Sequence, residues 1–441
     1  MSFRSSQLFI IILSLAFALP AWAGYADGED RPKNGSTEVW VGPNAFDDQG
    51  HVIPPSDWQQ LFDPAHEEEW KEVLMKADVY SFFIDTLKDY PPEAMRKIVA
   101  LLNRYHVKIE VEAGGTDEWT CGGDKATVGL RSAEIELNKL EPIYQAGGTV
   151  SYLALDNPTS RVGLNGRPLS TIPPQPNGCQ FPLPEAITQL IQYLKTVRAE
   201  RPEIKPGLIV NLPLEIYDHT PCGTAFYLPG PGNKLDDSRC FINIGHGGID
   251  YHEVFDSIMY GVKQAGLKLY FQHADNPYSY MINSPGVSDV VKQRLIPLEK
   301  QTESYGLAFG LIHNTDLAWQ YAPSAVPADP NVQDQLFHDQ TLQSVEALQN
   351  GGGKEEHLYI ESWQSYPHLI LPENVSSPPT FMYTVLGAIG LLNQPVTTPP
   401  VTTPPVTTLP VTTPPVTTPP KLNIWQQFWD ELKSLLLALH L

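Results

Sequence analysis

The sequence predicts an α/β fold: a (β/α)8 TIM barrel followed by a Pro/Thr-rich linker and a C-terminal amphipathic helix. Eight short apolar runs lie between Val39 and Ser362, and each ends at a polar residue before a loop and a stretch of helical periodicity. Strands that alternate with helices pair in parallel, and eight such units close into a barrel. The linker and the terminal helix are predicted by a sharp change of composition after residue 394.

The eight strand-like runs are rich in β-branched and aromatic residues, which strands favour. In chain order they read EVWVGPN, VYSFFIDT, VKIEVEAGG, VSYLALDNP, GLIVNLP, LKLYFQHADNP, LAFGLIHNT and HLYIESW. In such a barrel, the functional side chains gather at the carboxyl ends of the strands. The polar residues at these ends are Asn44, Asp85, Glu112, Asp156, Asn211, His273, Asn314 and Glu361.

Four segments between these runs place apolar residues at helical spacing, and several begin near a proline, aspartate or asparagine. They are residues 66–77, 91–105, 184–198 and 331–349. Glycines at 147–148, 266 and 351–353 stand before the next strand-like run, as glycines at helix ends do. A strongly apolar helix over residues 380–391 completes the ring.

The first 23 residues predict a signal peptide. Arg4 provides the positive charge, Leu8–Leu19 the apolar stretch, and Ala21-Trp22-Ala23 the small-residue cleavage site. The apolar stretch is short for a membrane-spanning helix. We therefore expect residues 1–23 to be removed, residues 24–394 to form the barrel domain, and the mature protein to be secreted, periplasmic or attached to the cell surface.

Four cysteines in an exported chain are compatible with two disulfides, because such compartments oxidise thiols. Cys121 follows the third strand-like run and Cys179 lies in the loop after the fourth, so the two loops are neighbours. Cys222 and Cys240 share the loop after the fifth run. Of the three connectivities, we expect Cys121–Cys179 and Cys222–Cys240. A zinc site is the weaker alternative, because no CxxC pair occurs.

The formal net charge of −21 disfavours a nucleic-acid partner. Phosphate binding needs clustered cations, and the sequence contains no basic run. The acidity suits solubility or a neutral or cationic substrate, and composition does not choose between them.

Residues 395–420 are built from repeats of PVTTP and predict an extended spacer without a core. Residues 421–441 follow it and form one broad apolar stripe at helical spacing, which predicts an amphipathic helix. A helix of this length needs a partner for its apolar face, namely a membrane surface, another protein or a second copy. The alternatives are packing on the barrel or a poorly ordered tail. Its polar face lacks basic residues, which disfavours strong binding to anionic lipid.

Side-chain alternation predicts which residues point into the barrel. In the third run, Val107, Ile109 and Val111 suit the helix-covered exterior, so Glu110 and Glu112 face inward. In the fourth run, Leu153 and Leu155 face outward, which turns Tyr152, Ala154 and Asp156 inward. In the eighth run, Leu358 and Ile360 face outward, which leaves Tyr359, Glu361 and Trp363 inside. Glu112, Asp156 and Glu361 are therefore predicted to meet at one mouth of the barrel.

Converging carboxylates raise one another's pKa and persist when paired, protonated or functional. Glycosidic cleavage uses such a pair: one carboxyl protonates the leaving oxygen, and the other acts as nucleophile or base. We assign the acid role to Asp156 and the nucleophile or base role to Glu361. Glu112 competes for either role.

Aromatic and amide side chains follow several strand ends, and flat rings beside neutral hydrogen-bonding groups suit sugars. The predicted substrate-binding residues are Asn44, Asp85, Asn211, His273, Asn314, Trp319 and Trp363. Three acidic residues also have structural interpretations. Glu110 can pair with Lys108 inside the barrel, Asp85 can cap the next helix, and Asp275 lies in a turn-forming Asp-Asn-Pro sequence.

With these residues in place, the chain resembles the secreted TIM-barrel glycoside hydrolases over residues 38–392. Asp156 follows the fourth strand-like run, where many of those enzymes keep their acid. The sequence lacks their usual Asn-Glu at the fourth strand, and His313-Asn314 stands where the seventh strand usually supplies a Glu. The resemblance implies a carbohydrate substrate and names no single family.

Two other functions fit the same residues. A metal-dependent barrel isomerase or hydrolase would use Glu112, Asp156, His273 and Glu361 as ligands, which suits manganese or zinc. A non-catalytic carbohydrate-binding protein would use the mouth of the barrel for attachment. The glycosidase interpretation is preferred and requires neither a metal nor a cofactor.

Overall fold

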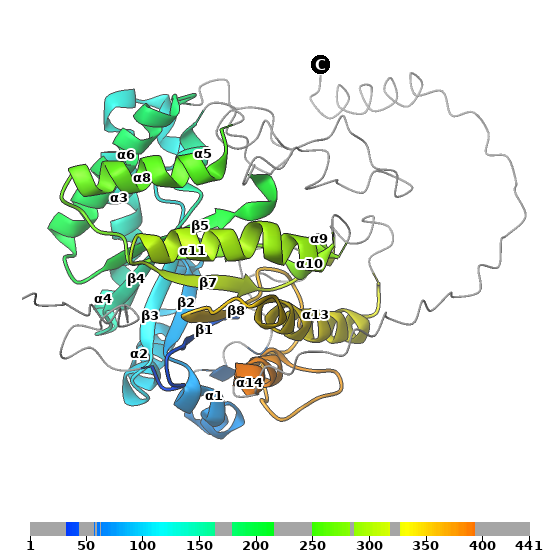
Figure 1. The fold of residues 1–441 in the computed structure, drawn as a ribbon. Helices are drawn as coiled ribbons and strands as arrows, with labels where there is room; N and C mark the ends of the chain where they lie inside the picture. Colours follow the sequence, from blue (N-terminus) through cyan, green and yellow to red (C-terminus); the bar gives the residue numbers. More distant parts are fainter. Residues whose placement is uncertain are drawn as a thin grey trace, which may run out of the picture. The chain divides into compact units, whose positions relative to one another are not determined.

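The computed structural model describes residues 32–43, 57, 60–61, 63–163, 179–215, 249–282, 286–317 and 327–392. Eight parallel strands form a closed barrel in which each strand pairs with the next and the eighth pairs with the first (Figure 1). The strands are β1 (Glu38–Gly42), β2 (Val79–Phe83), β3 (Lys108–Ala113), β4 (Val150–Asp156), β5 (Lys205–Asn211), β6 (Phe271–Asp275), β7 (Ala308–His313) and β8 (His357–Glu361). The fold is the (β/α)8 barrel that the sequence predicts.

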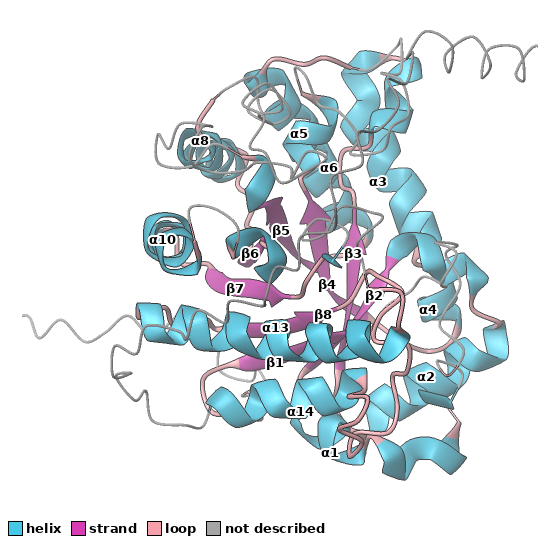
Figure 2. Ribbon diagram, turned by 90° about the vertical axis from the view of Figure 1, so that its right-hand side faces the viewer, coloured by secondary structure: helices cyan, strands magenta, loops and turns pink. Residues whose placement is uncertain are grey.

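Helices surround the strands as an outer layer (Figure 2). The α-helices described are α1 (Lys71–Lys76), α2 (Pro92–Arg104), α3 (Val128–Lys139), α4 (Glu141–Gln145), α5 (Pro158–Val162), α6 (Leu183–Glu200), α8 (Tyr251–Gln264), α9 (Tyr278–Met281), α10 (Val287–Val290), α11 (Ile296–Ser304), α13 (Pro330–Gly351) and α14 (Phe381–Leu392). Short 3-10 turns are η2 (Pro64–Glu69), η3 (Ile84–Asp89), η4 (Glu118–Gly122), η5 (Lys125–Thr127) and η6 (Leu212–Leu214), and η9 (Val291–Leu295) is π-helical. The expected helices at 66–77, 91–105, 184–198, 331–349 and 380–391 are all present, the first as η2 and α1 together.

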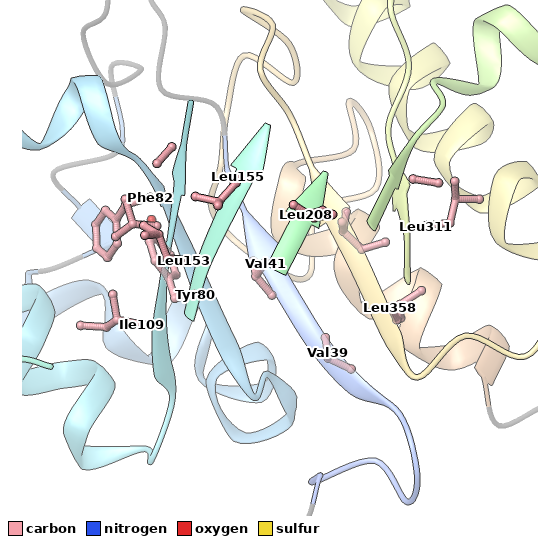
Figure 3. Close-up of a cluster of buried hydrophobic side chains, with 14 of the residues drawn as sticks. Val39, Val41, Tyr80, Phe82, Ile109, Leu153, Leu155, Leu208, Leu311 and Leu358 are labelled. Carbon is pink, nitrogen blue, oxygen red and sulfur yellow. The ribbon is translucent and has the colours of Figure 1, made fainter. Parts of the chain in front are cut away.

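Alternation along the strands divides the apolar side chains between two cores. The outward-facing set packs beneath the helices and includes Val39, Leu153 and Leu358 (Figure 3). A separate cluster fills the barrel interior; it consists of Trp40, Val79, Tyr152, Ala154, Ile209, Phe271, Ile312 and Tyr359. The parity predicted for the fourth and eighth strands is therefore correct.

Polar residues also lie inside the barrel at the amino ends of the strands. Lys108 Nζ lies 3.0 Å from Glu38 Oε1, and the hydroxyl of Tyr152 donates to the same carboxylate. The predicted pairing of Lys108 with Glu110 is wrong. Lys108 begins β3 and reaches Glu38 on β1, whereas Glu110 is fully buried farther along β3 and bonds with Ser81.

A disulfide joins Cys121 and Cys179, whose Cα atoms lie 5.0 Å apart. It links the segment after β3 to the segment before α6, which is the pairing expected from neighbouring loops. Lys125 Nζ donates to the carbonyl of Cys179 at 2.9 Å and adds a second link. Cys222 and Cys240 lie outside the described residues.

Several sequence predictions fall on parts of the chain that the structure does not describe. They are the signal peptide (1–23), the linker (395–420), the terminal helix (421–441), and the site residues Asn44 and Trp319. Within the described ranges, no helix has the length and apolar character required to cross a membrane.

Candidate active site

Glu112 and Glu361 are neighbouring carboxyl groups, and each changes the pKa of the other. Glu112 lies near the carboxyl end of β3 and Glu361 at that of β8, and both occupy inward positions. Glu361 is only 3 % exposed, whereas Glu112 is half-buried. Two neighbouring carboxylates repel each other when both are ionised, so this arrangement favours a proton on one of the pair.

The surroundings of Glu112 and Glu361 favour a proton on one of the two carboxyls. Burial raises the pKa of Glu112 well above its usual range, and repulsion from Glu361 and Asp156 adds to this. Burial also raises the pKa of Glu361, with repulsion from Asp275 as the next cause. The raised pKa values of both groups therefore favour one proton on the pair over full ionisation. The hydroxyl of Tyr359 donates to Glu361 Oε1 at 2.9 Å, which stabilises a charge on Glu361.

Asp156, at the end of β4, is held in an ion pair. Arg161 Nη2 lies 2.5 Å from Asp156 Oδ2, and Arg161 Nε donates to the Asp156 carbonyl at 2.9 Å. Asn211, at the end of β5, donates from Nδ2 to Asp156 Oδ1 at 2.9 Å. The Asp156 side chain is thus fixed by a cation and an amide beside the Glu112–Glu361 pair.

Asp275, at the end of β6, joins the same group of carboxyls. Burial raises the pKa of Asp275 to about 7, with repulsion from Asp156 as the second cause. Asn314 Nδ2 approaches Asp275 Oδ1 at 3.3 Å. From its Asp-Asn-Pro sequence, Asp275 is predicted to have a structural role in a turn. Alternation from Phe271, which lies in the barrel interior, would have identified its inward position.

Two predicted binding residues lie elsewhere. His273 is buried in the barrel interior, where its Nε2 is 2.9 Å from His357 Nδ1. Burial lowers the pKa of His273 well below its usual range, so its ring is neutral. Asp85 is exposed on η3 and pairs with Lys139 on α3 at 2.7 Å. Neither side chain lies in the cluster formed by the carboxyls of Glu112, Asp156, Asp275 and Glu361.

Trp363 follows Glu361 by two residues and is half-buried. Its indole Nε1 is buried and makes no hydrogen bond, and the same is true of Asn314 Oδ1. Buried polar atoms without partners are rare in proteins and are satisfied by ligands or water at functional sites. Of the predicted binding residues that the structure describes, Asn314 and Trp363 therefore retain groups suited to a polar ligand, whereas Asn211 is bonded to Asp156.

The described ranges contain no group of three or more His, Cys, Asp or Glu side chains arranged to hold a metal ion. The alternative ligand set of Glu112, Asp156, His273 and Glu361 is not assembled, because His273 bonds with His357 below the mouth. The remaining carboxyls are engaged with one another, with Tyr359 or with Arg161.

No protein-family model matches the sequence, and a search of curated proteins finds no match. Solved structures with a similar fold include a putative α-L-fucosidase from Bacteroides thetaiotaomicron, with 10% identity over 82% of this chain and 91% of that one, and a TM-score of 0.42. A D-psicose 3-epimerase from Clostridium cellulolyticum has 11% identity over 80% and 96% of the two chains, and a TM-score of 0.37. A psychrophilic family 10 endo-β-1,4-xylanase has 10% identity over 74% and 86%, and a TM-score of 0.40. Likeness at this distance carries no argument about the reaction, and the sequence belongs to no family that these comparisons identify.

Proposed function

We propose that this protein is a secreted glycoside hydrolase that cleaves a poly- or oligosaccharide with Glu112 as general acid and base and Glu361 as nucleophile. The observation that carries the proposal is the buried, mutually interacting Glu112–Glu361 pair at the carboxyl end of the barrel. Export is inferred from residues 1–23 alone.

Glycoside hydrolysis requires two carboxyls in opposite protonation states at the operating pH. A pair that shares one proton meets this requirement without any further group. Glu361 is the carboxyl that more readily carries the negative charge, because Tyr359 donates a hydrogen bond to it. Glu112 then holds the proton and serves as the acid.

The acid role that the sequence predicts for Asp156 is better suited to Glu112. A general acid must hold a proton in the free enzyme, whereas Asp156 is ion-paired with Arg161. Asp156 instead supplies negative charge near the reacting carbon, which suits the oxocarbenium-like transition state.

We further propose that hydrolysis proceeds with retention of the anomeric configuration, with Glu361 acting on the anomeric carbon itself rather than on a water. In the first step Glu361 attacks the anomeric carbon, the glycosidic bond breaks, and Glu112 gives its proton to the leaving oxygen. In the second step a water attacks that carbon, Glu112 takes the water's proton, and the bond to Glu361 breaks.

Hydrolysis of polysaccharides and aryl glycosides by the Glu361→Gln and Glu112→Gln variants tests the assignment. Both variants should lose at least about a thousandfold in kcat/KM, in the range seen when essential catalytic groups are removed. Asp85→Asn is the matched control, since Asp85 is an exposed carboxylate outside the cluster of Glu112, Asp156, Asp275 and Glu361. Unchanged hydrolysis by Glu361→Gln would refute the assignment. Carbohydrate binding by a wild-type protein that hydrolyses nothing would favour the attachment function.

The anomeric configuration of the first-formed sugar gives an independent measurement. Proton NMR during hydrolysis should show the same anomer as the substrate before mutarotation. The opposite anomer would show that Glu112 and Glu361 are not a nucleophile and acid pair.

A further inference from the structure

The mouth of the barrel, as far as the structure describes it, is acidic. The carboxyls that repel one another there are those of Glu112, Asp156, Asp275 and Glu361. Arg161 pairs with Asp156 at 2.5 Å. In the part of the chain that the structure describes, none of the other three carboxyls makes an ion pair with a lysine or arginine. Protons can relieve this repulsion, and so can a bound cation.

Asp275, at the end of β6, is bonded to a side chain that follows β7. Asn314 Nδ2 approaches Asp275 Oδ1 at 3.3 Å. The Asn314 amide oxygen is attached to the same carbon as this nitrogen, so it lies beside Asp275 as well. Asn314 is only 1 % exposed, yet its Oδ1 makes no hydrogen bond. This corner of the mouth therefore offers an unpaired buried acceptor beside a carboxyl, and buried acceptors are normally satisfied.

Two hydrogen bonds hold this corner in place. The backbone N–H of Tyr278 donates to the carbonyl of Asn314 at 3.0 Å, and that of Asp316 donates to Ser279 Oγ at 3.0 Å. They connect the segment after β6 to the segment after β7. Asp275 and Asn314 are thus positioned relative to each other before a ligand binds, which lowers the entropic cost of binding.

A cation that donates hydrogen bonds fits this corner. A primary ammonium has three N–H donors and one positive charge, so a single group can pair with Asp275 and donate to Asn314 Oδ1. A hydroxyl carries no charge and leaves the repulsion among the carboxyls unchanged. A metal ion is disfavoured, because the described ranges contain no group of three or more acidic, histidine or cysteine side chains arranged to hold one.

We propose that the glycan bound at this mouth contains an amino sugar with a free amine, whose ammonium group binds between the Asp275 carboxylate and Asn314 Oδ1. The inference rests on the proposed hydrolysis of a glycan at Glu112 and Glu361, and it names the class of that glycan. The ammonium also compensates the charge of Asp275, which repels Glu361. N-acetylation removes the charge and two of the three donors, so the N-acetylated form of the same sugar binds more weakly.

Binding to the Glu361→Gln variant tests the requirement for an amine. The probes are oligomers of glucosamine and of galactosamine, each beside its N-acetylated form, so that the members of a pair share a backbone and differ in charge. For at least one sugar, isothermal titration calorimetry should show the free-amine form binding about tenfold tighter or more, as a charged hydrogen bond predicts. Higher ionic strength should weaken this binding and leave that of the N-acetylated form unchanged.

Three results would overturn the proposal. They are equal affinity within both pairs, tighter binding of the N-acetylated forms, and no binding of either free-amine oligomer. Displacement of a bound free-amine oligomer by an equal concentration of calcium or manganese would assign the carboxyl cluster to a metal ion and would also overturn it.

Asp275→Asn, made in the same background, locates the ammonium. Asparagine has the size of aspartate and keeps an acceptor toward Asn314 Nδ2, so the variant removes the charge and should lose the preference for the free amine. Asp85→Asn is the matched control and should retain the full preference. A preference retained in Asp275→Asn would refute the site. If Asp275→Asn does not fold, Asn314→Leu, which removes the amide acceptor, should lower the preference in part, and an unchanged preference would overturn the proposal.

Hydrolysis of the same oligomers by the wild-type protein separates this proposal from the proposed function. The free-amine form should have the higher kcat/KM. If the free-amine oligomers bind with the expected preference and none is hydrolysed, the proposed function fails and the amine site stands. If both forms are hydrolysed equally fast and bind equally well, the proposed function stands and the amine site fails.

Discussion

Arg161 holds Asp156 at two points: its Nη2 lies 2.5 Å from the carboxylate and its Nε donates to the Asp156 carbonyl at 2.9 Å. The two residues are joined by the first turn of α5, so the same short segment that leaves β4 returns a cation to its last residue. This contact compensates one of the negative charges that surround Glu112.

Removal of that cation should increase the proton affinity of Glu112. In Arg161→Met the charge of Asp156 is uncompensated, and repulsion from Asp156 already raises the pKa of Glu112. We expect the alkaline limb of kcat/KM, which reports loss of the acid's proton, to move upward by roughly half a unit to one unit. Arg161→Lys should restore most of the wild-type profile. A downward shift would contradict the electrostatic role of this ion pair.

Glu136 on α3 predicts a pH-dependent stability. It accepts hydrogen bonds from the backbone of Gly114 and Gly115, yet burial raises its pKa to about 7. A carboxyl whose pKa is raised on folding favours the folded state below its unfolded value near 4.5, and this contribution is lost as the pH rises through 7. Thermal unfolding should show a decline between pH 5 and pH 8.

The control for this effect is Glu136→Gln, which removes the titration and retains an acceptor. The wild-type decline includes about 3 kcal/mol at most from Glu136, the equivalent of its pKa shift. The variant should show a correspondingly flatter dependence. An equal slope in both proteins would assign the decline to the other buried carboxyls.

The disulfide between Cys121 and Cys179 should stabilise the fold substantially. It closes a loop with a sequence separation of 58, for which chain entropy predicts about 4 kcal/mol. The free energy of unfolding of the Cys121→Ser/Cys179→Ser variant should be lower by that amount. The variant should therefore unfold at a lower denaturant concentration. Peptide mapping under non-reducing conditions identifies the linked peptides, and a linkage of Cys121 to another cysteine would refute this pairing.

His273 and His357 should remain neutral across the physiological range. Burial lowers the pKa of His357 to about 4, and that of His273 also falls well below its usual value. Their ¹⁵N resonances should not titrate between pH 5.5 and 8, whereas the resonances of an exposed histidine should. A histidine with a lowered pKa stabilises the fold above its unfolded value near 6.5, and this contribution is lost as the pH falls toward 4.

The sequence predicted the positions of inward residues better than their partners. Alternation placed Asp156 and Glu361 correctly, because it depends only on strand geometry. Alternation also predicts an inward position for Asp275, but the Asp-Asn-Pro sequence was interpreted as a turn. The partner of Lys108 on β3 was predicted incorrectly, since Glu110, which is close in sequence, was chosen over Glu38 on β1, two strands away in the barrel.

The sequence by itself determined the (β/α)8 class, the order of its strands and the set of carboxyls at their carboxyl ends. These properties follow from local periodicity, which a chain carries in its residue order. The signal peptide, the linker and the terminal helix stay predictions. Only the tertiary structure decided that Glu112 and Glu361 act on each other's pKa, that Arg161 pairs with Asp156 and that His273 turns toward His357. The physical reason is that proton sharing and ion pairing depend on distances across the closed barrel, between residues that no local pattern relates.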